Sequence, residues 1–350
     1  MATIELATPA TTDRPVRAAA RWLAVGRRAL PLLAVGLLAI EIVLVWPSLA
    51  GAVAAAAGAA PMLLLVAILA ETGSVIAFAA TTRAALGAAG VPVRLRTAVA
   101  TTVVAGALHT VMPAGNVFAT GYTFGKLRRW GAGPAAATWC LAISGVLAGA
   151  GLALIAATGL LVDSGSSWLS ELISAGLSLA AVVGLTLLAK HPRLLLVAAE
   201  SALRGWNRLL RRPATSGQDS VRRLLAGLGS VRPTPADWGR MSTASLANWL
   251  LDLAAFAVCV QAFGFSVSLS TLVLVYAAGM AASSLSPVPG GIGLVEGAMI
   301  LGLTAGGVAT SLAVAAVVTY RLIAVGGITV AGAAVLGHER LRRSTTLATG

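Results

Sequence analysis

The sequence predicts an all-α integral membrane protein, a polytopic bundle of helices that crosses the bilayer several times. Apolar residues make up 58% of the chain, charged residues only 11%, and the mean hydropathy is +0.90. A soluble domain has about a quarter of its residues charged, so this chain must use lipid as its solvent. A membrane β-barrel would instead show segments of about ten residues with alternating polarity, whereas the apolar windows here are long and continuous.

The apolar windows give the order of the predicted elements, since one helical crossing needs about 20 apolar residues. They cover 30–50, 61–82, 97–125, 133–159, 170–189, 243–264, 270–306 and 308–336. The first window follows a run of arginines, as in a signal peptide, but it contains Glu41 and follows a long polar leader. We therefore predict an uncleaved first span.

The positions of the basic residues predict the topology. All but one of the 25 Lys and Arg residues lie between the windows or at the termini. Because basic residues are in excess in cytoplasmic loops, the formal charge of +13 is a topology signal, and we expect no nucleic-acid partner. The prediction is a cell (plasma) membrane protein with a cytoplasmic basic tail at 1–29, a membrane domain at 30–337 and a cytoplasmic tail at 338–350.

One window is predicted to turn back inside the membrane. Window 97–125 ends at Lys126, Arg128 and Arg129, and a single crossing would place these residues and every later basic loop outside. The break at Pro113-Ala-Gly115-Asn116 allows two half-helices that enter and leave from the cytoplasmic side. Non-helical backbone at that depth must be shielded by protein or line a cavity.

A second window repeats this pattern from the outside. Window 270–306 is broken at Pro287-Val-Pro289-Gly290-Gly291 and has no basic residue at either end. The prediction is about six full spans plus two oppositely oriented re-entrant hairpins. Two full crossings in place of either hairpin would satisfy the same charges.

The two breaks share a PxGxxxxxG pattern at 113–121 and 289–297, which indicates an inverted repeat. Paired Gly/Pro interruptions in the two halves of a chain point to the midplane site of a transporter. Half-helix N-termini would direct backbone N–H groups toward an anion. The alternative is that the glycines serve close helix packing.

Ionisable residues within the windows are the next functional candidates, because a charge at the bilayer centre costs at least about 2.5–3.5 kcal/mol. Arg321 would pair with Asp252 or Glu296, or hold a phosphate or carboxylate in its planar fork. The acids left over would accept a cationic head group or carry protons. His109 lies beside the first break. The candidate substrate-binding residues are Arg321, Glu296, Asp252, Glu71, Pro113, Gly115, Asn116, Pro289, Gly290, Gly291 and Gly293.

Segment 190–241 is the one sizeable polar region. Leu196, Leu203 and Leu210 fall on one helical face and Arg204 and Arg208 on another, which suits a basic amphipathic helix on an anionic leaflet. A solvated connector is the alternative.

Cys140 and Cys259 lie far apart inside apolar windows, so we expect inert core residues and no metal site.

Two motifs carry a resemblance to a known family. Pro287-Val-Pro289-Gly-Gly-Ile-Gly293-Leu-Val-Glu296-Gly297, followed by Tyr320-Arg321-Leu, resembles the signature of the lysylphosphatidylglycerol synthase transmembrane-region family, also called flippase-like proteins. Met112-Pro113-Ala-Gly115-Asn116, with Gly125-Lys126-Leu and Trp130-Gly131 behind it, resembles the first-half motif of that family. The likeness covers roughly 30–340.

The resemblance implies a membrane domain that moves lipids between leaflets, with aminoacylated phosphatidylglycerol as the best-known substrate. In the synthases a soluble catalytic domain follows the membrane region. This sequence stops at Gly350, so we expect no aminoacyltransferase domain and no aminoacyl transfer.

The sequence therefore predicts a translocator of a lipid or lipid-linked substrate, not an enzyme, and no cofactor. We find no HExxH, GxSxG, Walker A or GxGD motif. The expected partners are membrane lipids: an anionic or aminoacylated phospholipid, or a polyprenyl-linked substrate. One alternative is an accessory membrane protein that partners a separate synthase or glycosyltransferase. Another is a proton-coupled small-solute transporter.

Overall fold

The computed structural model describes residues 60–112, 115–162, 231–286 and 288–348, and these residues contain helices and no strand. The predicted all-α class is confirmed for these ranges. Several predictions lie outside the described residues: the 1–29 tail, the 30–50 and 170–189 windows, Glu41, Pro113, Pro287, and the amphipathic face of Leu196–Leu210.

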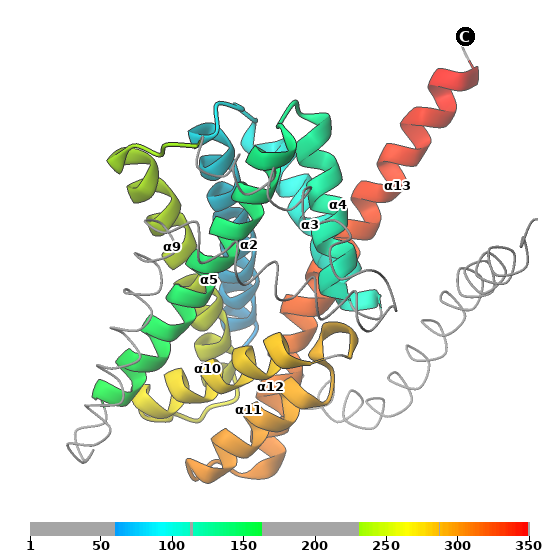
Figure 1. Ribbon diagram of the computed structural model, residues 1–350. Coiled ribbons are helices and arrows are strands. Elements are labelled where there is room, and N and C mark those ends of the chain that lie inside the picture. The colour runs from blue at the N-terminus through cyan, green and yellow to red at the C-terminus, as the bar shows by residue number, and fades with distance from the viewer. Residues whose placement is uncertain (1–59, 113–114, 163–230, 287, 349–350) are drawn as a thin grey trace, which may run out of the picture. The chain divides into compact units, whose positions relative to one another are not determined.

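The helices follow the predicted windows closely (Figure 1). Their bounds are α2 Pro61–Ala88, α3 Leu95–Val111, α4 Gly115–Arg129, α5 Pro134–Val162, α9 Pro235–Ala262, α10 Leu269–Leu285, the 3₁₀ turn η1 Pro289–Gly291, α11 Leu294–Ala305, α12 Thr310–Arg321, the π-helical turn η2 Leu322–Gly326 and α13 Gly327–Ala348.

In the described part of the chain, four helices are long and apolar enough to cross a membrane. They are Pro61–Ala88, Pro134–Leu160, Pro235–Ala262 and the continuous Thr310–Glu339. Each falls on a window predicted to be a full span. The helices extend past some windows: α9 begins at Pro235, inside segment 190–241, and α13 continues through most of the predicted 338–350 tail.

Large apolar side chains on the outer faces of these helices are exposed. Met62, Leu301 and Val330 are each 70% or more exposed, and Leu69 is 62% exposed. A soluble protein would bury such side chains, so this outward apolar surface is suited to contact with lipid.

Both predicted breaks are present as interruptions between two helices. Helix α3 ends at Val111 and α4 begins at Gly115, and the two helices pack against each other. Helix α10 ends at Leu285, and α11 begins at Leu294 after the η1 turn, again with the two helices in contact. Each is a helical hairpin with its break at the proline- and glycine-containing segment named from the sequence.

Two buried clusters hold the helices together. One contains Phe256, Tyr276, Met299 and Tyr320, from α9, α10, α11 and α12. The other joins α2, α4, α5 and the start of α9 through residues such as Leu127. Figure 1 shows α2 and α9 side by side, and this pair links the two clusters. Cys140 and Cys259 are buried in these clusters as free thiols, as predicted.

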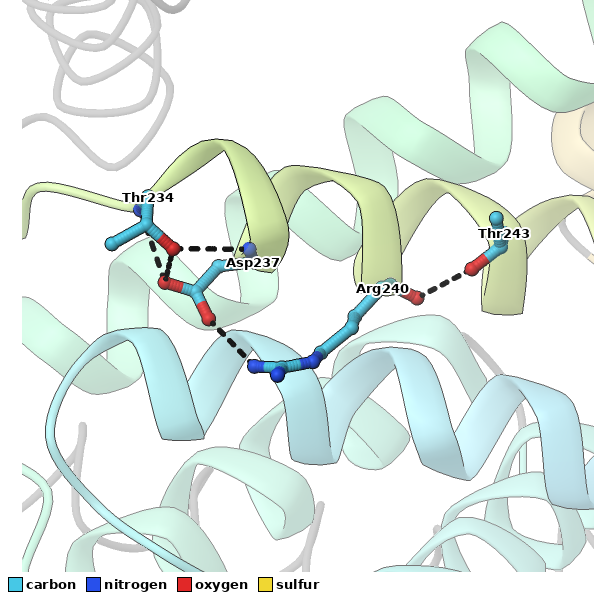
Figure 2. A network of polar contacts seen from close by, with 4 residues as sticks. All are labelled: Thr234, Asp237, Arg240 and Thr243. Atoms are coloured by element: carbon cyan, nitrogen blue, oxygen red, sulfur yellow. Dashed lines mark hydrogen bonds and ion pairs between the residues drawn. The ribbon is translucent and has the colours of Figure 1, made fainter.

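Helix α9 begins with a polar cap (Figure 2). The Thr234 backbone N–H donates to Asp237 Oδ2 at 3.0 Å, and the Asp237 N–H donates back to Thr234 Oγ1 at 3.2 Å. Arg240 reaches Asp237 Oδ1 at 3.4 Å. This capping box, with Pro235 in the first turn, satisfies backbone donors that would otherwise face the end of the span unpaired.

Replacing the cap residue should weaken the start of α9. Thr234→Ala removes the acceptor for the Asp237 N–H, so we expect the free energy of unfolding to fall by about 1 kcal/mol. Thr243→Ala is the control, because the Thr243 hydroxyl only donates to carbonyl groups of its own helix. Denaturation of both variants in mixed detergent micelles measures the difference, and equal losses would contradict the capping role.

Candidate functional site

The two helix breaks meet each other inside the bundle. The η1 turn of the second break packs against α3 of the first. A Cβ atom added at Gly290 would lie 3.4 Å from the Thr110 carbonyl oxygen, so the two backbones are nearly in contact. The Thr110 hydroxyl also hydrogen-bonds the Thr329 hydroxyl on α13 at 2.9 Å. The hairpin tips and the last helix therefore share one junction.

Glycine is required at this junction for two different reasons. A Cβ atom at Gly115 would lie 2.0 Å from the His109 carbonyl oxygen, so the start of α4 crosses the end of α3 with no room for a side chain. Gly290, Gly291 and Gly293 have φ values of 62°, 69° and 85°, which other residues rarely adopt. Pro289, Gly290 and Gly291 are buried.

Arg321 closes the second break. Its Nε lies 2.5 Å from Glu296 Oε1, and a terminal guanidinium nitrogen donates to the Gly290 carbonyl oxygen. The other Glu296 oxygen accepts from the Gly293 N–H at 2.6 Å. The Arg321 and Glu296 side chains are only 11% and 18% exposed. We call Arg321, Glu296, Gly290 and Gly293 the tip clamp; of the two partners predicted for Arg321, the structure selects Glu296.

Asp252 has different partners. Its Oδ2 accepts from the Tyr276 hydroxyl at 2.8 Å, and its Oδ1 accepts from the Tyr320 hydroxyl at 2.6 Å. The Glu71 side chain lines the same cavity as Asp252. Glu71 and Asp252, which lie on the paired helices α2 and α9, form what we call the acid pair.

The acid pair lines a polar cavity of about 510 Å³ among α2, α3, α4, α5, α9 and α13. His109 and Asn116 reach it from the first hairpin, and Asn248 and Ser144 from α9 and α5. No Lys or Arg of the described residues lines the cavity. A cavity with several convergent polar groups is the usual form of a small-ligand site.

A second hollow, an apolar groove of about 570 Å³, also has Glu71 among its lining residues. Its walls come from α2, α3, η2 and α13, with Ile68, Val99 and Leu322 among the lining residues. Glu71, Val75 and Ile328 line both the groove and the polar cavity. One carboxyl group therefore stands between a polar hollow and an apolar one.

The predicted site residues thus separate into two groups. Glu71, Asp252 and Asn116 meet at the polar cavity. Arg321, Glu296 and the glycines of the second break form the tip clamp and do not line that cavity. Pro113 lies outside the described residues. In the described ranges, no three His, Cys, Asp or Glu side chains gather as metal ligands.

Sequence reasoning missed several polar residues of the site. Tyr276 and Tyr320 were overlooked as hydroxyl donors, although the chain has only three tyrosines and a phenol in an apolar window needs a partner. Lys126 was interpreted as a topology signal, yet its Nζ lies 2.8 Å from Glu339 Oε1 and 5.4 Å from the centre of the Tyr122 ring. This ion pair ties α4 to α13. No sequence spacing links residues so far apart in the chain.

These features define the class of protein: a polytopic helical membrane protein with two broken hairpins, the first of which lines a polar cavity. The model of the family "Lysylphosphatidylglycerol synthase TM region" matches residues 32–332, and the chain belongs to this family. The suspected resemblance is therefore confirmed. No curated protein matches the chain.

A side chain at Gly115 should separate the two arms of the first hairpin. Gly115→Ala places a methyl group against the His109 carbonyl, which is backbone and cannot rotate away, so we expect a loss of about 1–3 kcal/mol in the free energy of unfolding. Gly121→Ala in the same helix meets no atom within 4 Å and serves as the control. Detergent denaturation compares the two. A Gly115→Ala protein as stable as Gly121→Ala would contradict the close approach.

Removing one charge of the tip clamp should destabilise the protein more than removing both charges. Arg321→Gln leaves the Glu296 carboxylate without its cation, and we expect unfolding to become easier by about 3–5 kcal/mol. The double variant Arg321→Gln/Glu296→Gln removes both charges and should recover a large part of this loss. Detergent denaturation measures the free energy of unfolding of both variants. A double variant no more stable than Arg321→Gln would mean that the unpaired Glu296 charge is not the cause of the destabilisation.

Proposed function

We propose that this protein moves a lipid or lipid-linked substrate between the two leaflets of the membrane, as a transporter and not as an enzyme. The observation that carries the proposal is the position of Glu71 between a polar cavity and an apolar groove. A lipid has the same two parts, a polar head group joined to an alkyl chain. The head group occupies the cavity while the chain lies along the groove.

The chemistry of the cavity favours one kind of head group. The carboxyl groups of Glu71 and Asp252 line it, and within the described ranges no Lys or Arg does. A head group that carries an amine, such as that of an aminoacylated phospholipid, suits this lining better than a purely anionic phosphate or a polyprenyl-linked phosphate. Membrane lipids, with an amine-bearing lipid as the substrate, are the partners of this proposal.

Arg321 then acts as a clamp on the pathway and not as the direct ligand of a phosphate. Its guanidinium already has Glu296 and the Gly290 carbonyl as partners. On the other hairpin, Lys126 pairs with Glu339 of α13. Each hairpin is thus tied to the continuous helix Thr310–Glu339 by one ion pair. Alternate release of the two pairs would let the hairpins open in turn.

The proposed topology completes this picture. Both termini lie in the cytoplasm of a plasma-membrane protein, and the hairpins enter from opposite faces. The support is the distribution of basic residues between the apolar windows together with the helix breaks at 112–114 and 286–293.

Filling the apolar groove should slow translocation. Purified protein in liposomes should accelerate the crossing of a fluorescent amine-bearing phospholipid, followed by chemical quenching of the outer leaflet. Ala331→Phe projects a ring into the groove and should lower the rate at least about tenfold. The control is Val330→Phe, because Val330 is 71% exposed and does not line the groove.

Two results would contradict the proposal. One is no acceleration by the wild-type protein. The other is an equal rate in Ala331→Phe and Val330→Phe, which would remove the groove from the pathway.

A further inference from the structure

The acid pair places two carboxyl groups in one cavity that no Lys or Arg of the described residues lines. The Arg321 guanidinium, a cation on α12, is held by Glu296 and the Gly290 carbonyl. Two ionised carboxylates in one cavity of a membrane domain repel each other. The pair therefore needs a cation or a proton.

The hydrogen-bond partners distinguish the two carboxyl groups. An ionised carboxylate can only accept hydrogen bonds, so it is stabilised where donors reach its oxygens. Asp252 already accepts from the Tyr276 and Tyr320 hydroxyls, one on each oxygen. No N–H or O–H group of the described residues donates to the buried Glu71 Oε2. Asp252 thus has the donors that stabilise an anion, whereas Glu71 Oε2 has none in the described residues.

A second observation points to a ligand in front of Glu71. Ser144, which lines the polar cavity, is only 8% exposed, and its Oγ has no hydrogen-bond partner among the described residues. The His109 Nδ1 atom, on the opposite wall, is also buried and unpaired in the described part of the chain. Buried polar atoms normally have hydrogen-bond partners, so these two atoms are available to a ligand that enters the cavity.

The charge of Glu71 depends on the titratable groups of the helices that surround it. Helix α2 packs against α3, α5, α9 and η2. Helix α5 contributes the neutral Ser144, and η2 has no titratable residue. Among the described residues, His109 on α3 and Asp252 on α9 line the same cavity as Glu71. Tyr276 on α10 and Tyr320 on α12 donate to Asp252. Cys259 on α9 interacts electrostatically with Glu71, and Arg321 on α12 with Asp252.

We propose that Glu71 is a proton-exchange site whose proton and a cationic ligand of the polar cavity exclude each other. When an ammonium group enters, the Glu71 O–H bond breaks, the proton passes to water, and the carboxylate left behind binds the ammonium. When the ammonium leaves, the carboxylate takes a proton back from water. One positive charge enters as one leaves, so the net charge of the cavity stays constant. This proposal rests on the proposed function and adds proton coupling to it.

The first test measures the proton directly on the wild-type full-length protein. Infrared spectroscopy detects the C=O stretch of a protonated carboxylic acid, and ¹³C-labelled glutamate shifts only a glutamic acid band. We expect a glutamic acid band at neutral pH that disappears in Glu71→Gln and persists in the control Asp237→Asn. A spectrum without a protonated glutamate, or one that Glu71→Gln leaves unchanged, would overturn the proposal.

The second test measures the exchange. Octylammonium is the probe, because its chain suits the groove and its head suits the cavity, and octyl sulfate is the anionic control. We expect octylammonium to abolish the glutamic acid band. Its affinity should rise with pH by up to about tenfold per unit, because proton and ligand compete for one carboxylate. Glu71→Gln should bind it weakly and without this pH dependence, and Glu71→Asp should restore the dependence.

The outcomes separate this proposal from the proposed function. If the protein translocates lipid but binds octylammonium with an affinity that does not depend on pH, proton exchange is overturned and translocation stands. Conversely, proton-coupled binding by a protein that moves no lipid in liposomes would overturn translocation and leave Glu71 as a proton-exchange site.

Discussion

Arg321 connects the end of α12 to α11 and to the η1 turn, at the point where the last long helix changes from an α-helix to a π-helix. Its guanidinium contacts Glu296 at the start of α11 and the carbonyl of Gly290 in η1. The π-helical turn Leu322–Gly326 follows immediately. A lone charge and an unpaired carbonyl group are both costly in hydrocarbon, so each of these groups holds the others in place. The second hairpin depends on this interaction for its shape.

Glu71 and Asp252 form one polar centre, and Glu296 and Arg321 form another. The tip clamp contains one positive and one negative charge, with the backbone N–H of Gly293 on the second carboxylate oxygen. The acid pair has tyrosine hydroxyls instead of a cation. Tyr320 donates to Asp252, while the next residue, Arg321, belongs to the clamp. One turn of α12 therefore contributes to both centres, which keeps their distance fixed.

Small residues bring the helices close enough to form these centres. A Cβ atom at Gly332 would lie 2.6 Å from the Val103 carbonyl oxygen, and one at Gly106 would lie 2.2 Å from the Ile328 side chain. Helices α3 and α13 therefore pack with their backbones nearly in contact, as glycine permits in membrane proteins. Ile328, held by this packing, forms part of the wall between the polar cavity and the apolar groove. The separation of the two hollows is thus a consequence of glycine positions.

The helical class, four of the long spans and the two helix breaks could be predicted from the sequence, because they follow from local apolar length and from proline and glycine. The family could be recognised from the motifs at the two breaks. Glu71, Asp252, Glu296 and Arg321 could also be named in advance, since any ionisable residue in an apolar window is costly enough to stand out. Which acid pairs with Arg321 became visible only in the folded protein. Glu296 and Asp252 fitted equally well by position, and the choice depends on the η1 turn, which directs the Gly290 carbonyl and the Glu296 carboxylate to the same guanidinium. The tyrosine partners of Asp252, the Lys126–Glu339 pair and the cavity walls likewise join residues from distant helices, so packing fixes them and no local pattern records them.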